Sequence, residues 1–230
     1  MPPTIVIQGV GEVKYGLFLG LIVLAAGCVS TRNVTVSNER TKDWQGKTIA
    51  VTTRPRADFV AMTAGKAAFA VVGAVAMIEA GKTIVKENEV DDPTPVLAQS
   101  LIKVAETHYG VMPAMNASVP IDTTDVPKLA HAASGADLLL DVQSMGNQFR
   151  YFPTDWSHYA VDSSFKVRLI DVHAGSLLAE GFCRQTTQKD PSPPTKSELL
   201  ADKAARLKSI LATQRDACLQ ELTRDVLGIT

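Results

Sequence analysis

The segment that most constrains the fold is residues 136–142, which read Ala-Asp-Leu-Leu-Leu-Asp-Val. Apolar residues occupy nearly every position instead of alternating with polar ones. A short run of this kind is typical of a β-strand that is covered on both faces. It therefore predicts a sheet that is buried between other layers of the structure.

The segments around this strand alternate between strand and helix patterns. Before it we expect a strand at 47–53, an Ala/Gly-rich helical segment at 57–87, a helix at 95–108 capped by Thr94, a strand at 111–119 near a sheet edge, and a short helix at 125–133. After it we expect a half-exposed strand at 159–171, a partner strand at 176–187, and a long helix capped by Thr195 or Ser197. This order predicts an α/β (α+β) fold, in which a mixed sheet starts with parallel β-α-β-α-β units, ends in an antiparallel hairpin, and is covered by helices.

The N-terminal residues have the pattern of an export signal. Residues 16–26 form an uncharged apolar run that follows Lys14 and precedes Gly27 and Cys28. The run is shorter than the roughly 20 residues that span a bilayer, and it matches the apolar core of a signal peptide. Residues 24–28, Leu-Ala-Ala-Gly-Cys, resemble the bacterial lipobox, although a short buried helix with a chance cysteine is the alternative. We therefore expect residues 1–27 to be the signal peptide. Its first twelve residues contain Glu12 and no basic residue, whereas a signal peptide begins with a short basic region, so Val13 is an alternative translation start.

The lipobox resemblance implies the organisation of the rest of the chain. Cys28 would become the lipidated, palmitate-carrying N-terminus, residues 28–46 a flexible tether, and residues 47–230 a single periplasmic domain. Val29 follows the cysteine, and the lack of Asp at that position implies the outer rather than the inner membrane, by resemblance to enterobacterial lipoproteins.

The remaining cysteines, Cys183 and Cys218, form an even pair. Thiols in an oxidising compartment commonly form disulfides, so we expect a bridge between the strand that carries Cys183 and the final helix that carries Cys218. Two separately buried thiols are the alternative.

Three glycines, Gly65, Gly73 and Gly81, are spaced eight residues apart in the Ala/Gly-rich segment. Residues eight apart lie near one face of a helix, and small residues there allow a second helix to approach closely. The spacing therefore predicts a helix-packing interface, either within the chain or with a partner. A helix buried on all sides within its own domain is the alternative.

Several short motifs resemble one group of proteins. They are residues 47–53, the helix-Gly-strand junction at 134–140, and the hairpin at 167–179. Together they resemble a group of bacterial lipoproteins that includes the curli secretion-channel lipoprotein, activators of penicillin-binding proteins, and the N-terminal domain of the Tol-system β-propeller protein. The resemblance implies an architecture more than a function.

No motif for catalysis, metal binding or cofactor binding stands out. The four histidines stand singly, and no HExxH, CxxC, GxSxG or phosphate-loop spacing occurs. The net charge is −1, without a basic block, which argues against nucleic-acid binding. We expect a non-enzymatic, lipid-anchored interaction or assembly protein of the cell envelope that docks on a partner or on copies of itself. A lipid-anchored hydrolase or small-ligand-binding protein is the alternative.

Overall fold

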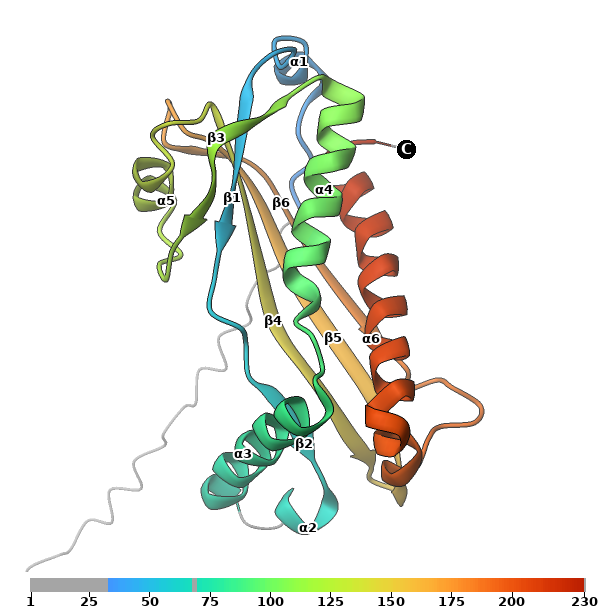
Figure 1. Ribbon diagram of the computed structural model, residues 1–230. Helices are drawn as coiled ribbons and strands as arrows, with labels where there is room; N and C mark the ends of the chain where they lie inside the picture. The colour runs from blue at the N-terminus through green and yellow to red at the C-terminus, as the bar shows by residue number, and fades with distance from the viewer. Residues whose placement is uncertain (1–32, 68–69, 230) are drawn as a thin grey trace, which may run out of the picture. The chain divides into compact units, whose positions relative to one another are not determined.

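The computed structural model describes residues 33–67 and 70–229. Its helices are α1 (Asn38–Thr41), α2 (Ala64–Ala67), α3 (Ala70–Asn88), α4 (Pro93–Tyr109), α5 (Val126–Ala132) and α6 (Lys196–Asp225). Its strands are β1 (Thr48–Thr53), β2 (Phe59–Met62), β3 (Met112–Pro120), β4 (Leu138–Phe152), β5 (Asp155–Asp171) and β6 (Ser176–Thr186). Figure 1 shows these elements arranged around one long, twisted sheet.

The sheet has the order β3-β1-β4-β5-β6, and β2 pairs with β4 beyond the end of β1. Strand β1 is parallel to both β3 and β4, whereas β4, β5 and β6 run antiparallel to one another. The predicted fold class is therefore confirmed, including the parallel start and the antiparallel hairpin at the end. Strand β3 lies at the edge of the sheet, where its Pro113 was expected to place it.

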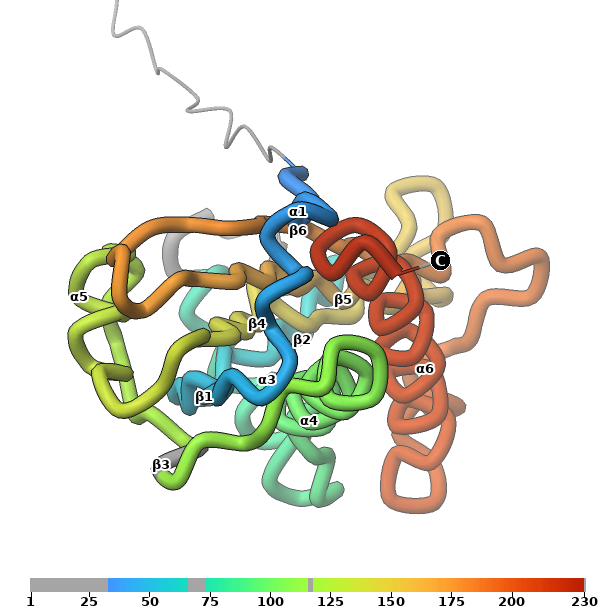
Figure 2. The backbone as a smooth tube through the Cα atoms, turned by 90° about the horizontal axis from the view of Figure 1, so that it is seen from above, coloured from blue at the N-terminus to red at the C-terminus, as the bar shows by residue number. Residues whose placement is uncertain are grey.

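Both faces of the sheet are covered, and the start of β4 shows how. Side chains alternate between the two faces of a strand. Leu138 and Leu140 pack with α4 and the second half of α6, while Leu139 packs with α5. All three leucines are almost fully buried. Helices α4 and α6 lie side by side on the face of the sheet that carries Leu138 and Leu140 (Figures 1 and 2). Because α5 covers the opposite face, the run at 136–142 is apolar without alternation.

Strands β4 and β5 are longer than predicted and pair with each other, and β5 is more deeply buried than predicted. Strand β4 continues to Phe152, where the sequence turns polar. The expected half-exposure of β5 is wrong, because outward positions such as Ala160, Asp162, Arg168 and Ile170 are buried too. Ile170 lies under α5, and Asp162 is bound by side chains of β4.

Residues 34–46 belong to the domain, so the expected tether over 28–46 is wrong for this part. Val34 and Glu180 of β6 exchange two backbone hydrogen bonds, of 2.7 and 2.8 Å. Val36 and Trp44 are buried in the main core. Alternating apolar residues here bury enough surface to hold the segment on the sheet.

The Ala/Gly-rich segment is not a continuous helix, because residues 59–62 form β2. Helix α3 is also not buried on all sides, since Val75 is 59% exposed. Gly73 is buried in α3, and Gly65 of α2 has open space around it. At Gly81, a Cβ atom would lie 1.6 Å from the carbonyl oxygen of Phe59. The close neighbour of Gly81 is therefore strand β2, not the helix that was expected.

Three helix starts rest on side-chain caps, and that of α5 is the expected Asp125, which accepts from the Lys128 backbone N–H. Of the two expected caps of α6, Thr195 and Ser197, the structure has Thr195, which Glu198 completes into a capping box. Helix α4 is capped by Asp92 rather than Thr94, since the Asp92 carboxylate accepts hydrogen bonds from the Thr94 backbone N–H and hydroxyl. Proline at the first position of α4 suits this geometry, because its missing N–H needs no partner there.

The disulfide between Cys183 and Cys218 is present, which confirms the predicted pairing. It joins β6 to α6 within the main core, where both cysteines are fully buried. Closing a loop of 35 residues is worth about 3–4 kcal/mol in the chain-entropy model.

Candidate binding groove and its polar floor

A groove of about 430 Å³ opens between the first half of α4 and strands β1 and β3. Most of the surface that lines it is apolar, although polar and charged residues outnumber the apolar ones, which are Val51, Pro95, Ala98, Ile102, Pro113 and Val142. Its volume lies within the range of small-ligand sites in proteins. A second hollow, of about 460 Å³, lies further along α4 beside Lys103 and His108, so the groove is distinguished by its lining and not by its volume.

The groove exists because β3 leaves β1 for part of its length. Ile49 of β1 pairs with Pro113, but Val51 already pairs with Ser118. Residues 114–117 of β3 lie between these two pairs, opposite the single residue Ala50 of β1, so the ladder is interrupted there. Ala98 of α4 also lines the groove, and its small side chain fills little of the space.

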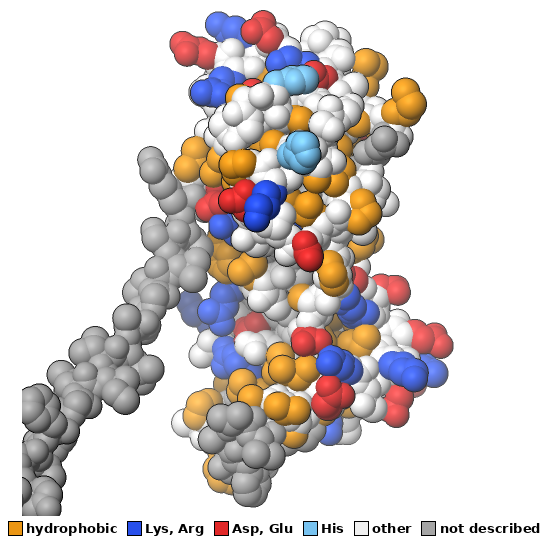
Figure 3. Space-filling model, turned by 90° about the vertical axis from the view of Figure 1, so that its left-hand side faces the viewer, with side chains coloured by type: hydrophobic (Ala, Val, Ile, Leu, Met, Phe, Trp, Pro, Cys, Tyr) orange, Lys and Arg blue, Asp and Glu red, His pale blue; other side chains and the backbone are white. Residues whose placement is uncertain are grey.

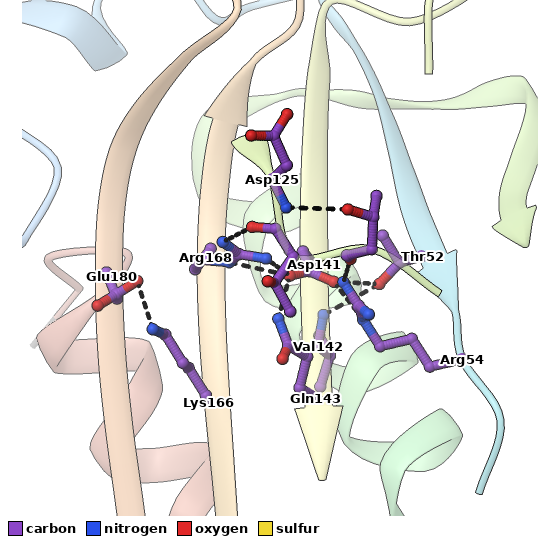
Figure 4. Close-up of polar contacts among 11 residues, drawn as sticks. Thr52, Arg54, Asp125, Asp141, Val142, Gln143, Lys166, Arg168 and Glu180 are labelled. Carbon is purple, nitrogen blue, oxygen red and sulfur yellow. Dashed lines mark hydrogen bonds and ion pairs between the residues drawn. The ribbon is translucent and has the colours of Figure 1, made fainter. Parts of the chain in front are cut away.

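The floor of the groove is held in place by Asp141 of β4, which is 0% exposed. The Thr52 hydroxyl donates to Asp141 at 2.8 Å, and the Arg54 Nε donates to the same oxygen at 2.7 Å. Figure 4 shows both side chains turned toward Asp141. Thr52 and Arg54 therefore direct these polar groups into the protein and not into the groove.

A second arginine completes this buried cluster. Arg168 of β5 donates from Nε and Nη2 to the other Asp141 oxygen, at 3.0 and 2.6 Å, and Gln143 donates to that oxygen as well. The two guanidinium groups also donate to backbone carbonyls of the loop before α5, at Thr123 and Thr124.

The electrostatics of Asp141 follow from this arrangement. Burial alone would raise its pKa, but the hydrogen bonds and positive charges of Arg54 and Arg168 outweigh that effect and lower the pKa. One carboxylate is thus shared by two arginines, and its charge is needed to keep both of them in place.

Charged side chains at the groove lie at its ends and balance one another. Lys103 forms an ion pair with Glu106 at 3.1 Å, three residues further along α4. Arg54 and the α4 cap, Asp92, lie at the other end. The groove therefore joins an apolar interior to rims without net charge.

The outer edge of β3 beside the groove carries exposed apolar side chains. Met112 is 51% exposed and Met115 is 100% exposed. In the described part of the chain, no strand pairs with this edge. Figure 3, which views the side of β3 and α5, shows hydrophobic side chains spread over this face, with charged side chains gathered at its top and in its lower half.

The groove and the Asp141 cluster were not anticipated from the sequence. A signal was present, because two charged residues, Asp141 and Arg168, interrupt segments that otherwise read as buried strands. Such residues are rarely buried unless they are paired. Cys28, the predicted lipidation site, lies outside the described residues.

Within residues 33–67 and 70–229, no group of three or more His, Cys, Asp or Glu side chains is arranged to hold a metal ion. Over the same residues, no helix is both long and apolar enough to cross a membrane.

Comparison with known proteins gives structural likenesses only. No protein-family model and no curated protein sequence matches the chain. Among solved structures, lipoprotein GNA1162 from Neisseria meningitidis is 15% identical and has a TM-score of 0.27, over 74% of this chain and 99% of that one. The uncharacterized lipoprotein B from Nitrosomonas europaea is 13% identical, with a TM-score of 0.35, over 78% and 82%. The PelC dodecamer from Paraburkholderia phytofirmans is 13% identical, with a TM-score of 0.28, over 80% and 95%. Such low identities and TM-scores assign the chain to no family.

Proposed function

We propose that this protein is a lipid-anchored, non-enzymatic interaction module on the periplasmic side of the outer membrane, and that it associates with further copies of itself through β3. The lipobox-like residues 24–28 support the anchor. The observation that carries the association is the bare, methionine-bearing edge of β3.

The two edges of the sheet differ in a way that supports this role. The edge of β6 is covered by Val34, which pairs with Glu180, and by Asn33, which accepts a hydrogen bond from the Phe182 backbone N–H. The edge of β3 has no such cover in the described residues. Unpaired backbone groups on an edge strand are a template for pairing with another strand. Flexible methionine side chains suit an adaptable contact surface.

We expect Met115→Lys to weaken self-association by at least about tenfold, which is about 1.4 kcal/mol. A charge at the centre of the contact would have to be desolvated when the edges meet. Native mass, measured by light scattering over a range of protein concentrations, reports the effect. The unlipidated Cys28→Ser protein serves as the background, so that the anchor does not contribute.

The matched control is Met145→Lys on β4, because Met145 is an exposed methionine too, at 51% against 100% for Met115, but lies away from the β3 edge. It should leave the native mass unchanged. A parent protein that stays monomeric throughout the range, or equal effects of the two lysines, would contradict association through β3.

For the anchor, we expect Cys28→Ser to release the protein from membranes. Without the thiol no lipid can be attached, and the apolar run at 16–26 is too short to span a bilayer. Detergent phase separation of envelope fractions measures the change, with Ser30→Ala as the control that keeps the cysteine. Continued partition of the Cys28→Ser protein into the detergent phase would rule out lipidation at this residue.

A further inference from the structure

We propose that the groove between α4 and strands β1 and β3 binds a linear acyl chain, as found in fatty acids and phospholipids. This role is separate from association through the β3 edge. It concerns the interior of the groove and not the outer side of the strand.

The walls favour a hydrocarbon. Val51 and Val142 rise from the sheet, and Ala98 and Ile102 face them from α4. None of these four side chains offers a hydrogen bond. The part of a ligand that lies between these four side chains must be apolar, because a buried polar group without a hydrogen-bond partner is unfavourable.

The floor supports the same class of ligand. Thr52 and Arg54 bring polar groups to the groove, but both are bound to Asp141 at 2.8 and 2.7 Å. Sites built to recognise polar ligands present hydrogen-bonding groups to the ligand. Here Thr52 and Arg54 are bound to Asp141, and the other hydroxyls of the lining are paired too, Thr53 with Ser118 and Thr94 with Asp92. The site therefore discriminates mainly by shape and apolar contact.

The ends of the groove complete the match to an amphipathic ligand. The ion pair of Lys103 and Glu106 lies at one end, and Arg54 and Asp92 lie at the other. A site for a single acyl chain must provide an apolar interior for the hydrocarbon and a polar, solvent-facing rim for the head group. The balanced rim charges match a ligand without high net charge better than a multiply charged one.

The test uses cis-parinaric acid, a fatty acid that fluoresces when its chain enters an apolar site. Titration into the purified protein should give saturable binding. Gln99→Trp should weaken it by at least about tenfold. Gln99 is exposed and lines the groove. An indole ring at this position can therefore be accommodated without disturbing the core, and it would occupy space that the ligand needs.

The matched control is Val96→Trp, which places the same side chain on the same helix at a residue that is 43% exposed and does not line the groove. Its binding should stay within about twofold of the parent, which is about 0.4 kcal/mol. Equal thermal unfolding midpoints would show that both variants are folded. Absence of saturable binding to the parent, or equal binding by the two variants, would overturn the proposal.

Competition identifies the source of the chain. Displacement of the probe by unlabelled palmitate supports a free fatty acid as the ligand. Displacement by phosphatidylglycerol alone supports a phospholipid chain. Displacement by neither compound would overturn the proposal, because the conjugated double bonds of the probe, and not its acyl chain as such, would then account for its binding.

Discussion

Replacement of Asp141 with alanine should destabilise the domain by about 3–5 kcal/mol, the cost of leaving a buried charge without its partner. Asp141 is fully buried, and its two oxygens accept from Arg54, Arg168, Thr52 and Gln143. Urea-induced unfolding, followed by far-ultraviolet circular dichroism, measures the loss. Asp122→Ala is the control, since Asp122 is exposed in the nearby loop and should change stability by less than about 0.5 kcal/mol.

The Asp141 effect should also depend on pH, with a sign fixed by its lowered pKa. A carboxylate whose pKa is lower in the folded state stabilises the protein above its unfolded-state pKa. This contribution is lost as the pH falls through the folded-state pKa. The stability gap between the parent and Asp141→Asn should therefore narrow as the solution is acidified. A gap that stays constant from neutral to acidic pH would mean that the charge of Asp141 contributes nothing.

Gly81→Ala should destabilise the domain by about 3 kcal/mol, at the upper end of the range for overpacked interiors. The added methyl carbon would lie 1.6 Å from the Phe59 carbonyl oxygen and 2.5 Å from its carbonyl carbon. Both atoms belong to the backbone of β2, so no rotation of a side chain relieves the clash. Helix α3 and strand β2 would have to move apart to make room. The loss of stability would be measured as a lower midpoint of thermal unfolding.

Gly65→Ala is the matched control for this substitution. Gly65 also lies in a helix of the Ala/Gly-rich segment, but no atom approaches its added Cβ within 4 Å. It should leave stability unchanged or raise it by up to about 1 kcal/mol, because alanine favours helices more than glycine does. Equal losses from the two alanines would show that the effect comes from helix propensity and not from contact with β2.

Much of the fold follows from local sequence patterns. The unalternated run at 136–142 predicted a strand with two covered faces, and α4 and α5 supply the covers. The Thr195 cap, the edge position of β3 and the pairing of Cys183 with Cys218 were also predicted. In each case the deciding interaction is local or has a chemical signature of its own.

The features that were missed depend on contacts between distant parts of the chain. Strand β2 has only four residues, and its neighbour is β4, as in the pair of Phe59 with Asn147. The groove arises from a register shift between β1 and β3, which hydrophobic periodicity does not encode. The Asp141 cluster combines residues from β1, β4 and β5, and only the full topology brings them together.

The placement of residues 33–36 determines how a mechanical load on the N-terminus would enter the domain. Val34 is bonded to Glu180 of β6, and the Val36 backbone N–H donates to the carbonyl of Val226, just beyond α6. Asn33 contacts the same two regions, through Phe182 and Asp225. A pull on a membrane anchor would thus be divided between the two elements that the disulfide joins covalently. Strand β6 and helix α6 would resist it together, and neither would peel from the core alone.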